Sequence, residues 1–495
     1  MGKSLTPMAI LSTIVSIFYV ILLVVVLLLV IADNSPTPNK LAWILILAAF
    51  PVLGLVLYFL VGFSIREKWK YEKRHESSLK VFMEQRTPEL SDLIYGDGGD
   101  LVDERWRPLV KLLSGPMSRA HCGNSYEIIT KGERKLELLL QDLAAAKHSI
   151  HVEYFHFGND EAARKIKELL MQKAREGVQV RFIYERLANF PIPSRYYYEM
   201  KKAGVQIVRY KGPHGGLLSH VTTLNYRDHR KIMLIDGKIG YTGGMNLNKN
   251  YFYIWKDAHL RIMGRSVASL QTIFLDGWLG NGGTLTSPLE EYFPMLKDVP
   301  EPSFDENREG VFHGKTMMVV PDEPDSNYPL TLFGYEWIIH NAEKYIYFQT
   351  PYFVPPDSIL DALKAAALRG VDVRLMVPRK VDTPLMSAAN RSYFQECFSA
   401  GMKIYEREGE FIHAKTLVCD DGLLMIGTTN IDNRSFSLNT EDNAFIFDPE
   451  GAKYYKGLFM KELEISKEVT AERWAKRKLL YRMSERLMRL FSPLL

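Results

Sequence analysis

The feature that most constrains the fold is a motif that occurs twice in the chain. Counted from His229 or from His413, a lysine follows at +2, an aspartate at +7, a glycine at +14, an asparagine at +17 and an acid at +28. The first copy contains Lys231, Asp236, Gly243, Asn246 and Asp257, and the second contains Lys415, Asp420, Gly427, Asn430 and Glu441. A single HxK pattern is common, but two copies in register predict two similar domains.

The segments around the two motifs alternate between strand-like and helix-like patterns in the same order. Residues 149–157 (SIHVEYFHF) form a predicted strand, 160–177 an amphipathic helix and 178–185 another strand. Residues 345–353, 358–370 and 371–377 repeat that order in the second half. This alternation predicts an α/β fold with a central sheet in each half, divided near residue 300.

The spacing within each motif also has a chemical meaning. Side chains two residues apart on a strand point to the same side, so each motif would bring an imidazole and an ammonium group to one place. If the two halves pair about a pseudo-twofold axis, two histidines, two lysines and two asparagines converge, and such donors stabilise a phosphate without a metal ion. The glycines at +14 would let a ligand approach the backbone.

The acidic residues of the motifs are assigned two different roles. An imidazole is a usable nucleophile at neutral pH when an acid holds its other ring nitrogen, and Asp257 and Glu441 are the candidates for that orienting role. Asp236 and Asp420 directly follow the apolar strand residues. They are candidate catalytic residues, but a structural turn or ion pair is the favoured interpretation.

The first 65 residues contain two runs without charged residues, 4–32 and 41–64, each long enough to cross a bilayer as a helix. We expect a transmembrane hairpin with spans at about 8–31 and 41–63. The first run could be a signal peptide, but its apolar core exceeds the ~7–15 residues of such segments. Basic residues in 66–74 place both chain ends and the large C-terminal part in the cytoplasm, by the positive-inside rule.

The remaining segments are a connector (66–116), the two domains (117–300 and 301–469) and a basic amphipathic tail (470–495). On a helix, the tail carries apolar residues on one side and basic residues on another. The tail either packs its apolar side on the second domain or lies in an anionic membrane surface. Three cysteines without CxxC spacing give no zinc signal, and a net charge of +4 does not favour nucleic-acid binding.

The two segments HRKIMLIDGKIGYTGGMN and HAKTLVCDDGLLMIGTTN resemble the paired HxKxxxxD motifs of the phospholipase D superfamily. With the N-terminal hairpin, the chain is similar to the bacterial cardiolipin synthases. This resemblance implies two phospholipase D-like domains, each a mixed sheet flanked by helices, in the bacterial plasma membrane. It also implies phosphatidyl transfer between two phosphatidylglycerol molecules, which yields cardiolipin and glycerol without a cofactor or metal.

The resemblance further assigns roles to individual residues. His229 would be the nucleophile and His413 the general acid and base. The phosphate-binding residues would be Lys231, Lys415, Asn246, Asn430, Gly243, Gly244, Gly427 and Thr428.

Three alternatives to cardiolipin synthesis start from the same motifs. A phospholipase D-type hydrolase or a phosphatidylserine synthase would share the covalent intermediate and differ only in the acceptor. A nuclease on this scaffold would need a basic groove and no membrane spans. A non-catalytic membrane scaffold would tolerate the loss of a histidine or lysine, yet both sets are intact.

Overall fold

The computed structural model describes residues 7–32, 37–59, 99–115, 117–211, 226–294, 304–305, 308–324, 326 and 328–492. Most of the predicted connector lies outside these residues. Its described part holds a short helical turn, η2 (Gly99–Leu101), and helix α6 (Arg107–Leu113).

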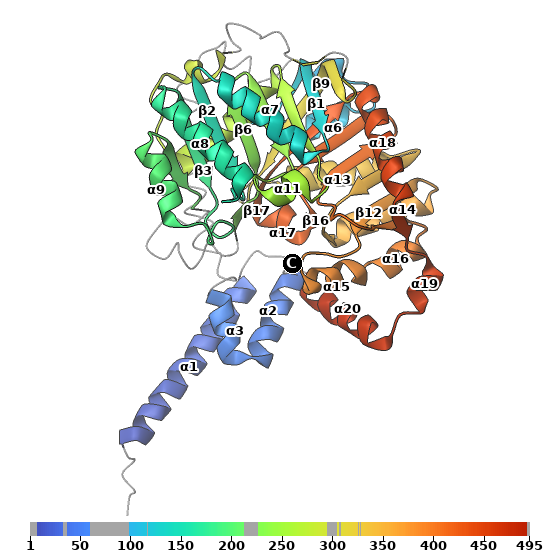
Figure 1. Ribbon diagram of the computed structural model, residues 1–495. Helices are drawn as coiled ribbons and strands as arrows, with labels where there is room; N and C mark the ends of the chain where they lie inside the picture. Colours follow the sequence, from blue (N-terminus) through green and yellow to red (C-terminus); the bar gives the residue numbers. More distant parts are fainter. Residues whose placement is uncertain are drawn as a thin grey trace, which may run out of the picture.

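One large mixed sheet runs through both halves of the chain (Figure 1). From one edge to the middle, its strands are β18 (Ser466–Glu468), β13 (Lys403–Arg407), β12 (Asp372–Pro378), β10 (Tyr345–Gln349), β14 (Thr416–Cys419), β15 (Leu423–Gly427), β17 (Asn439–Phe447) and β9 (Val311–Asp322). From the middle to the other edge, they are β1 (Ala120–Ile129), β8 (His259–Met263), β7 (Ile239–Gly243), β6 (Lys231–Ile235), β2 (Ser149–Tyr154), β3 (Gln179–Tyr184) and β4 (Gln206–Arg209). A short strand, β5 (Arg227–Asp228), pairs with β17, and β11 (Phe353–Val354) pairs separately with β16 (Ile431–Asp432).

The order of the strands shows the pseudo-twofold relation between the halves. The seam is the antiparallel pair β1 and β9, and the strands on its two sides correspond one to one: β8 with β17, β7 with β15, β6 with β14, and β2-β3-β4 with β10-β12-β13. Strands β2, β3 and β4 are parallel to one another, as are β10, β12 and β13, because helices connect each strand to the next. The short edge strand β18 is antiparallel to β13. The predicted α/β fold with two related halves is confirmed, and their sheets join into one along β1 and β9.

Helices cover both faces of this sheet. On one face, α12 (Ser266–Gly280) and α18 (Pro449–Glu464) pack on strands of both halves and form one shared core. The other face carries separate cores for the two halves. Its helices are α7 (Gly132–Ala145), α8 (Glu161–Arg175), α9 (Ser194–Lys202) and α11 (Lys249–Tyr253) in the first half, and α13 (Leu330–Asn341), α14 (Asp357–Leu368), α15 (Pro384–Ser392), α16 (Phe394–Ser399) and α17 (Asn433–Ser437) in the second. The 3-10 turn η3 (Leu289–Tyr292) ends the first half; the division predicted near residue 300 falls outside the described residues and stays a prediction.

The N-terminal segment differs from the prediction in its second part. Helix α1 (Pro7–Ala32) is continuous, and within the described residues its stretch Leu11–Ala32 is the one long and apolar enough to cross a bilayer. The predicted second span is instead divided into α2 (Thr37–Ala49) and α3 (Pro51–Leu57). Pro51 causes the break because it lacks an N–H group and its ring clashes with the preceding turn. Helix α3 folds back on α2, where a Cβ on Gly54 would lie 3.0 Å from the carbonyl oxygen of Ile46.

The tail forms α19 (Ala471–Ala475) and α20 (Leu479–Phe491), and α20 packs against α15 of the second half. Of the two alternatives for the tail, packing of its apolar side on the second domain is contradicted, because Leu480, Met483, Leu487 and Leu490 are exposed. The buried side of α20 contains Glu485, which pairs with Arg477, and Arg489, whose guanidinium lies over the ring of Tyr393. Its apolar side points away from the protein.

Candidate active site

Two short backbone pairings cross between the halves and position the histidines. Strand β5 pairs in parallel with the start of β17, and directly after it the His229 N–H donates to the Thr440 carbonyl oxygen at 2.9 Å. In the same way, a bridge joins Lys256 and Ile412, and the His413 N–H donates to the Lys256 carbonyl oxygen at 2.7 Å. Each histidine is therefore held by the backbone of the opposite half.

This crossing corrects the prediction that each histidine and lysine lie together on one strand. His229 precedes β6, which begins at Lys231, and His413 and Lys415 both precede β14. The reason is the hydrogen bond described above. The N–H of each histidine is bonded to a carbonyl oxygen of the opposite half, so strand pairing within its own half begins only after the histidine.

The two acids of the motif bind the histidines crosswise. His229 Nδ1 lies 2.8 and 3.0 Å from the two carboxylate oxygens of Glu441, and His413 Nδ1 lies 2.8 Å from Asp257 Oδ2. Glu441 directly follows Thr440, and Asp257 directly follows Lys256, the residues whose carbonyl oxygens accept the histidine N–H groups. Two consecutive residues of each half therefore provide both contacts to the histidine of the other half. Both acids are buried. The pairing fixes each ring and leaves its Nε2 facing away from the acid.

The lysines and asparagines of both motifs surround the same two rings. Lys231 Nζ and Lys415 Nζ each donate to the carbonyl oxygen of the histidine two residues earlier at 2.5 Å, and Lys415 Nζ also lies 2.6 Å from His413 Nδ1 and 3.1 Å from its Nε2. Asn246 Oδ1 accepts the N–H of His156 at 3.1 Å. Asn430 Oδ1 is buried and has no hydrogen-bond partner among the described residues.

Both histidines open into one cavity of about 700 Å³ between the halves. Asn246 and Asn430 line it, together with the guanidinium-bearing residues Arg227 and Arg434. Aromatic rings form much of the remaining wall: Phe155 meets the His229 ring edge-on at 5.0 Å, Trp255 stacks near His413 at 5.6 Å, and the Tyr251 hydroxyl lies 3.4 Å from His413 Nε2. The cavity thus combines cationic donors with apolar surface, as a phosphate with an attached lipid requires.

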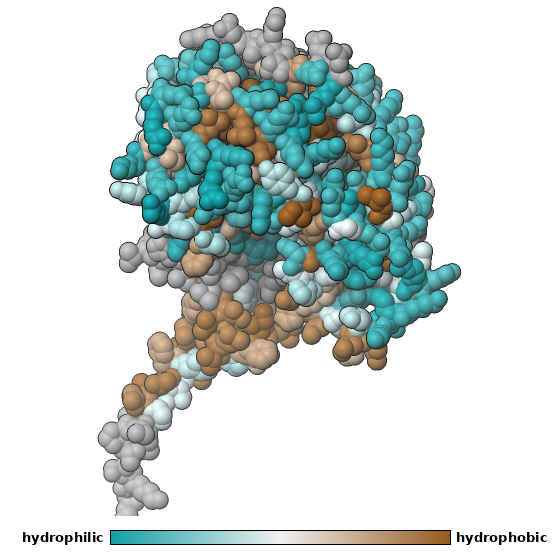
Figure 2. Space-filling view, in the orientation of Figure 1, coloured by the Kyte–Doolittle hydropathy of each residue, from teal (hydrophilic) through white to brown (hydrophobic). Residues whose placement is uncertain are grey.

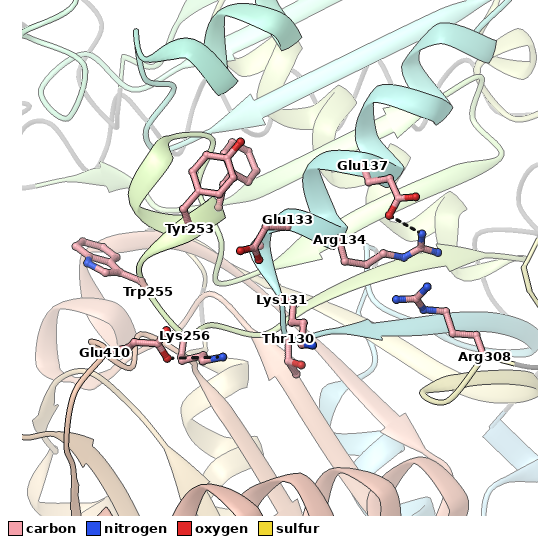
Figure 3. Close-up of a pocket in the computed structure, with 12 residues that line it drawn as sticks. Thr130, Lys131, Glu133, Arg134, Glu137, Tyr253, Trp255, Lys256, Arg308 and Glu410 are labelled. Atoms are coloured by element: carbon pink, nitrogen blue, oxygen red, sulfur yellow. Dashed lines mark hydrogen bonds and ion pairs between the residues drawn. The ribbon is translucent and has the colours of Figure 1, made fainter. Parts of the chain in front are cut away.

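A second cavity, of about 660 Å³, lies on the other side of Trp255 (Figure 3). Four of its charged side chains are paired with one another, Arg134 with Glu137 and Lys256 with Glu410. It contains neither histidine of the motifs. The cavity between the halves is therefore the candidate active site.

Burial changes the charge state of the central groups. It lowers the pKa of both imidazoles well below the usual value, and the neighbouring Lys231 and Lys415 lower it further. Burial also raises the pKa of Asp257 to about 6 and of Glu441 to about 7. It lowers the pKa of Lys231 to about 8 and of Lys415 to about 7. At neutral pH the imidazoles are neutral, with Nδ1–H directed at the acid and a lone pair on Nε2.

Asp236 and Asp420 lie outside the cavity lining. Asp236 accepts the backbone N–H groups of Lys147, His148 and Ser149 at 2.7 to 2.9 Å. Asp420 accepts those of residues 343–345 at 2.7 to 2.8 Å and pairs with Arg105. Both aspartates have positive φ, at 51° and 49°, which matches a turn. They close the loop before β2 or β10, as the favoured structural interpretation expected.

The glycines and the threonine predicted to bind phosphate pack closely against protein. A Cβ on Gly244 would lie 2.0 Å from Asp257 Oδ1, and one on Gly427 would lie 1.9 Å from Asn443 Oδ1. Gly243 has φ 134°, and a Cβ on it would lie 2.7 Å from His259 Cα. Thr428 exchanges hydrogen bonds with the backbone of Asp442. The atoms that approach these glycines closely belong to the acids and their strands, and the part of the glycines in phosphate binding stays a prediction.

Several residues of the site carried no motif signal. The Arg230 guanidinium is buried and donates to the Glu441 carbonyl oxygen at 3.2 Å and to Glu323 at 2.8 Å. Asp442 is buried beside Glu441 and accepts the Thr242 hydroxyl across the halves. The aromatic run YFYIW at 251–255 was the one sequence pattern that indicated part of the cavity wall.

Among the residues that the structure describes, no three His, Cys, Asp or Glu side chains are grouped as metal ligands. The polar groups facing the cavity are chiefly amides and cations, with Asp382 and Asp432 at its lining.

Comparison with known proteins places the chain in a family. The family model described as "Cardiolipin synthase, PLD-like domain" matches residues 139–278 and 336–463, and "Phospholipase_D-nuclease N-terminal" matches residues 17–62. The major cardiolipin synthase ClsA of Bacillus subtilis is 34% identical over 99% of this chain and 100% of its own length. Cardiolipin synthase 2 of Bacillus cereus is 36% identical over 94% of this chain and 88% of its own length.

The crystal structure of the phosphatidylserine synthase of Haemophilus influenzae is similar in fold, with a TM-score of 0.54 and 14% identity over 75% of this chain and 95% of that chain. The N-terminal match and the apolar α1 indicate a membrane-associated protein. From the family matches and the relatives that cover nearly its whole length, the chain belongs to the phospholipase D-like cardiolipin synthase family.

Proposed function

We propose that this protein is a phosphatidyltransferase that makes cardiolipin and glycerol from two molecules of phosphatidylglycerol. The observation that carries the proposal is the pair of crossed histidine–acid contacts facing one cavity between the halves. The names of the relatives support the product, because cardiolipin synthases match nearly the full chain. Phosphatidylglycerol is the lipid from which such a transfer gives cardiolipin with glycerol as the leaving group.

His229 is the proposed nucleophile. Its Nε2 attacks the phosphorus of the first lipid, the bond from phosphorus to the glycerol oxygen breaks, and His413 Nε2 gives that oxygen its proton. His413 then takes a proton from the hydroxyl of the second lipid, whose oxygen attacks the phosphorus and breaks the bond to His229. One contact supports this division of roles, because the Tyr251 hydroxyl lies 3.4 Å from His413 Nε2, the atom that gives and takes the proton.

The crossed acids serve the two roles differently. Glu441 stabilises the positive charge that appears on the His229 ring when Nε2 becomes bonded to phosphorus. Asp257 supports protonated His413, whose pKa in the empty site is low because of burial and Lys415. An arriving phosphate diester brings a negative charge, which favours the protonated ring.

Lys231, Lys415, Asn246 and Asn430 are the proposed phosphate ligands. They approach the two rings from both halves, and their donors would stabilise the equatorial oxygens in the transition state. Arg227 and Arg434, which line the same cavity, add cationic surface for the second phosphate of the reaction.

The N-terminal segment anchors this site at the cytoplasmic side of the bacterial plasma membrane. In our proposal α1 crosses the bilayer and the second apolar run, broken at Pro51, returns the chain to the same side. The basic residues of 66–74 support the cytoplasmic orientation. Both substrates are then lipids of one leaflet, which favours lipid-to-lipid transfer over release to water.

The test uses purified full-length protein reconstituted with phosphatidylglycerol alone. We expect cardiolipin and glycerol in equal amounts. His229→Ala and His413→Ala, checked for folding by thermal melting, should each abolish both products. Release of phosphatidic acid without cardiolipin would show a hydrolase and overturn the proposal.

A further inference from the structure

Helix α20 has the reverse of the usual arrangement for a surface helix. Apart from Met488, its protein-facing side is polar, with Glu485 paired to Arg477 and Arg489 lying 3.2 Å from Glu396. Its outward side is apolar: Leu480 is 78% exposed, Leu487 56% and Leu490 63%. Leu479 and Met483 continue the same face. Soluble proteins seldom expose a contiguous apolar face of this kind without a partner.

Basic side chains border this apolar face. At 100° per residue, Arg482 and Arg486 lie between the outward face and the buried side of α20. At its N-terminal end, Lys476 and Lys478 line a groove of about 810 Å³ between α20 and α15, together with Arg391. Arg391 Nε is buried and has no hydrogen-bond partner among the described residues. An apolar face flanked by cations is complementary to an anionic lipid surface.

The position of α20 supports the same partner. Figure 1 shows α15 and α20 on the side of the catalytic part from which α1, α2 and α3 project. Figure 2 shows apolar side chains along this edge, next to those of the N-terminal helices. A bilayer that contains α1 would therefore meet the outward face of α20, whereas a second copy would bring the basic flanks of two α20 helices together.

Helix α15 connects this surface to the active site. Thr383 and Met386, at its start, line the catalytic cavity, while Leu385 and Ala388 line the groove beside α20. The short helix α15 thus separates the catalytic cavity from the groove beside α20.

We propose that α20 lies in the surface of an anionic bilayer, with Leu480, Met483, Leu487 and Leu490 in the acyl region. Lipid phosphates occupy the basic groove between α20 and α15. This contact holds the mouth of the catalytic cavity at the depth of the lipid headgroups. It is a second attachment to the membrane, separate from α1.

The test measures the depth of α20 in the bilayer and does not require catalysis. Full-length protein with Leu487→Cys, in a Cys122→Ser background, is labelled with an environment-sensitive fluorophore and reconstituted into vesicles of phosphatidylglycerol and phosphatidylcholine with brominated acyl chains. The matched control carries the label at Lys453→Cys, an exposed position on α18. We expect severalfold stronger quenching at 487 than at 453, and Arg482→Gln with Arg486→Gln should reduce the quenching at 487.

Quenching at 487 no stronger than at 453 would overturn the proposal, and cross-links between unquenched 487 positions would identify a second copy as the partner. The same labels in a His229→Ala background should give the same quenching, so a failure of the proposed chemistry would not be mistaken for a failure of this contact. As a functional readout, Leu487→Glu with Leu490→Glu should lower turnover on vesicles severalfold while leaving the melting temperature unchanged, because both side chains are exposed.

Discussion

Replacing Glu441 with glutamine tests the crossed pairing most directly. The amide keeps the shape of the side chain and an acceptor for His229 Nδ1–H, now 2.8 Å from the acid, but it removes the negative charge. A hydrogen bond to a charged group contributes about 1.5–3 kcal/mol, and this contribution matters most when the His229 ring is bonded to phosphorus and positive. At ~1.4 kcal/mol per factor of ten, formation of the phosphatidyl-histidine should slow roughly 10- to 150-fold.

The assay distinguishes the roles of the two histidines by changing the leaving group of the lipid substrate. Phosphatidyl-p-nitrophenol needs no proton on its leaving oxygen, whereas phosphatidylglycerol does. Rapid-quench measurements on both lipids should show that Glu441→Gln slows the first step with either leaving group. Asp257→Asn is the matched variant, because its partner His413 serves only as acid and base. It should slow release of glycerol but leave release of p-nitrophenol nearly unchanged.

The reverse pattern would refute the crossed pairing. If Asp257→Asn slowed p-nitrophenol release and Glu441→Gln did not, then Asp257 would serve the nucleophile. Both variants should fold, because a neutral amide is less costly to bury than a carboxylate, and burial already raises the pKa of Glu441 to about 7. Unchanged thermal melting would confirm this point.

Three further predictions concern single positions around the site. Lys415, whose pKa burial lowers to about 7, loses its charge as the pH rises through that value, so kcat/KM should fall there, and Lys415→Arg should move this fall to higher pH in a pH–rate profile. Gly244→Ala would place a Cβ 2.0 Å from Asp257 Oδ1, and the displaced acid should reduce glycerol release at least as much as Asp257→Asn, measured by the same rapid-quench assay. Asp236→Ala removes the acceptor of three backbone N–H groups and should cost about 1–3 kcal/mol in denaturant unfolding, while turnover per folded molecule stays at the wild-type level.

Much of the fold follows from local patterns that the repeat made reliable. The alternation in residues 149–185 and its copy in 345–377 predicted parallel strand–helix–strand units, and β2-α8-β3 and β10-α14-β12 are those units. A single segment does not show whether tertiary contacts will override its local pattern. The agreement between two copies of the pattern made the prediction reliable without that information. The histidines, lysines and asparagines could be assigned to one site for the same reason. A pseudo-twofold axis superimposes residues that have the same offset in the two motifs.

The crossing of the acids could not be predicted in this way. Asp257 and Glu441 have the same offset from their own histidines, and equal offsets do not say which half an acid reaches. That depends on where β5 meets β17 and where Ile412 meets Lys256, which are contacts between segments far apart in sequence. Periodicity likewise divided α20 into two faces without showing which face meets the protein. The packing of α20 on α15 and the contact of Arg489 with Glu396 decided it.

The crossed construction of the site has a consequence for the chain during its synthesis. The first half leaves the ribosome with a histidine but without the carboxylate that orients it, and the second half alone has the same deficiency. In our proposed mechanism the site is complete only when both halves have docked along β1 and β9, so a chain that lacks either half should transfer no phosphatidyl group.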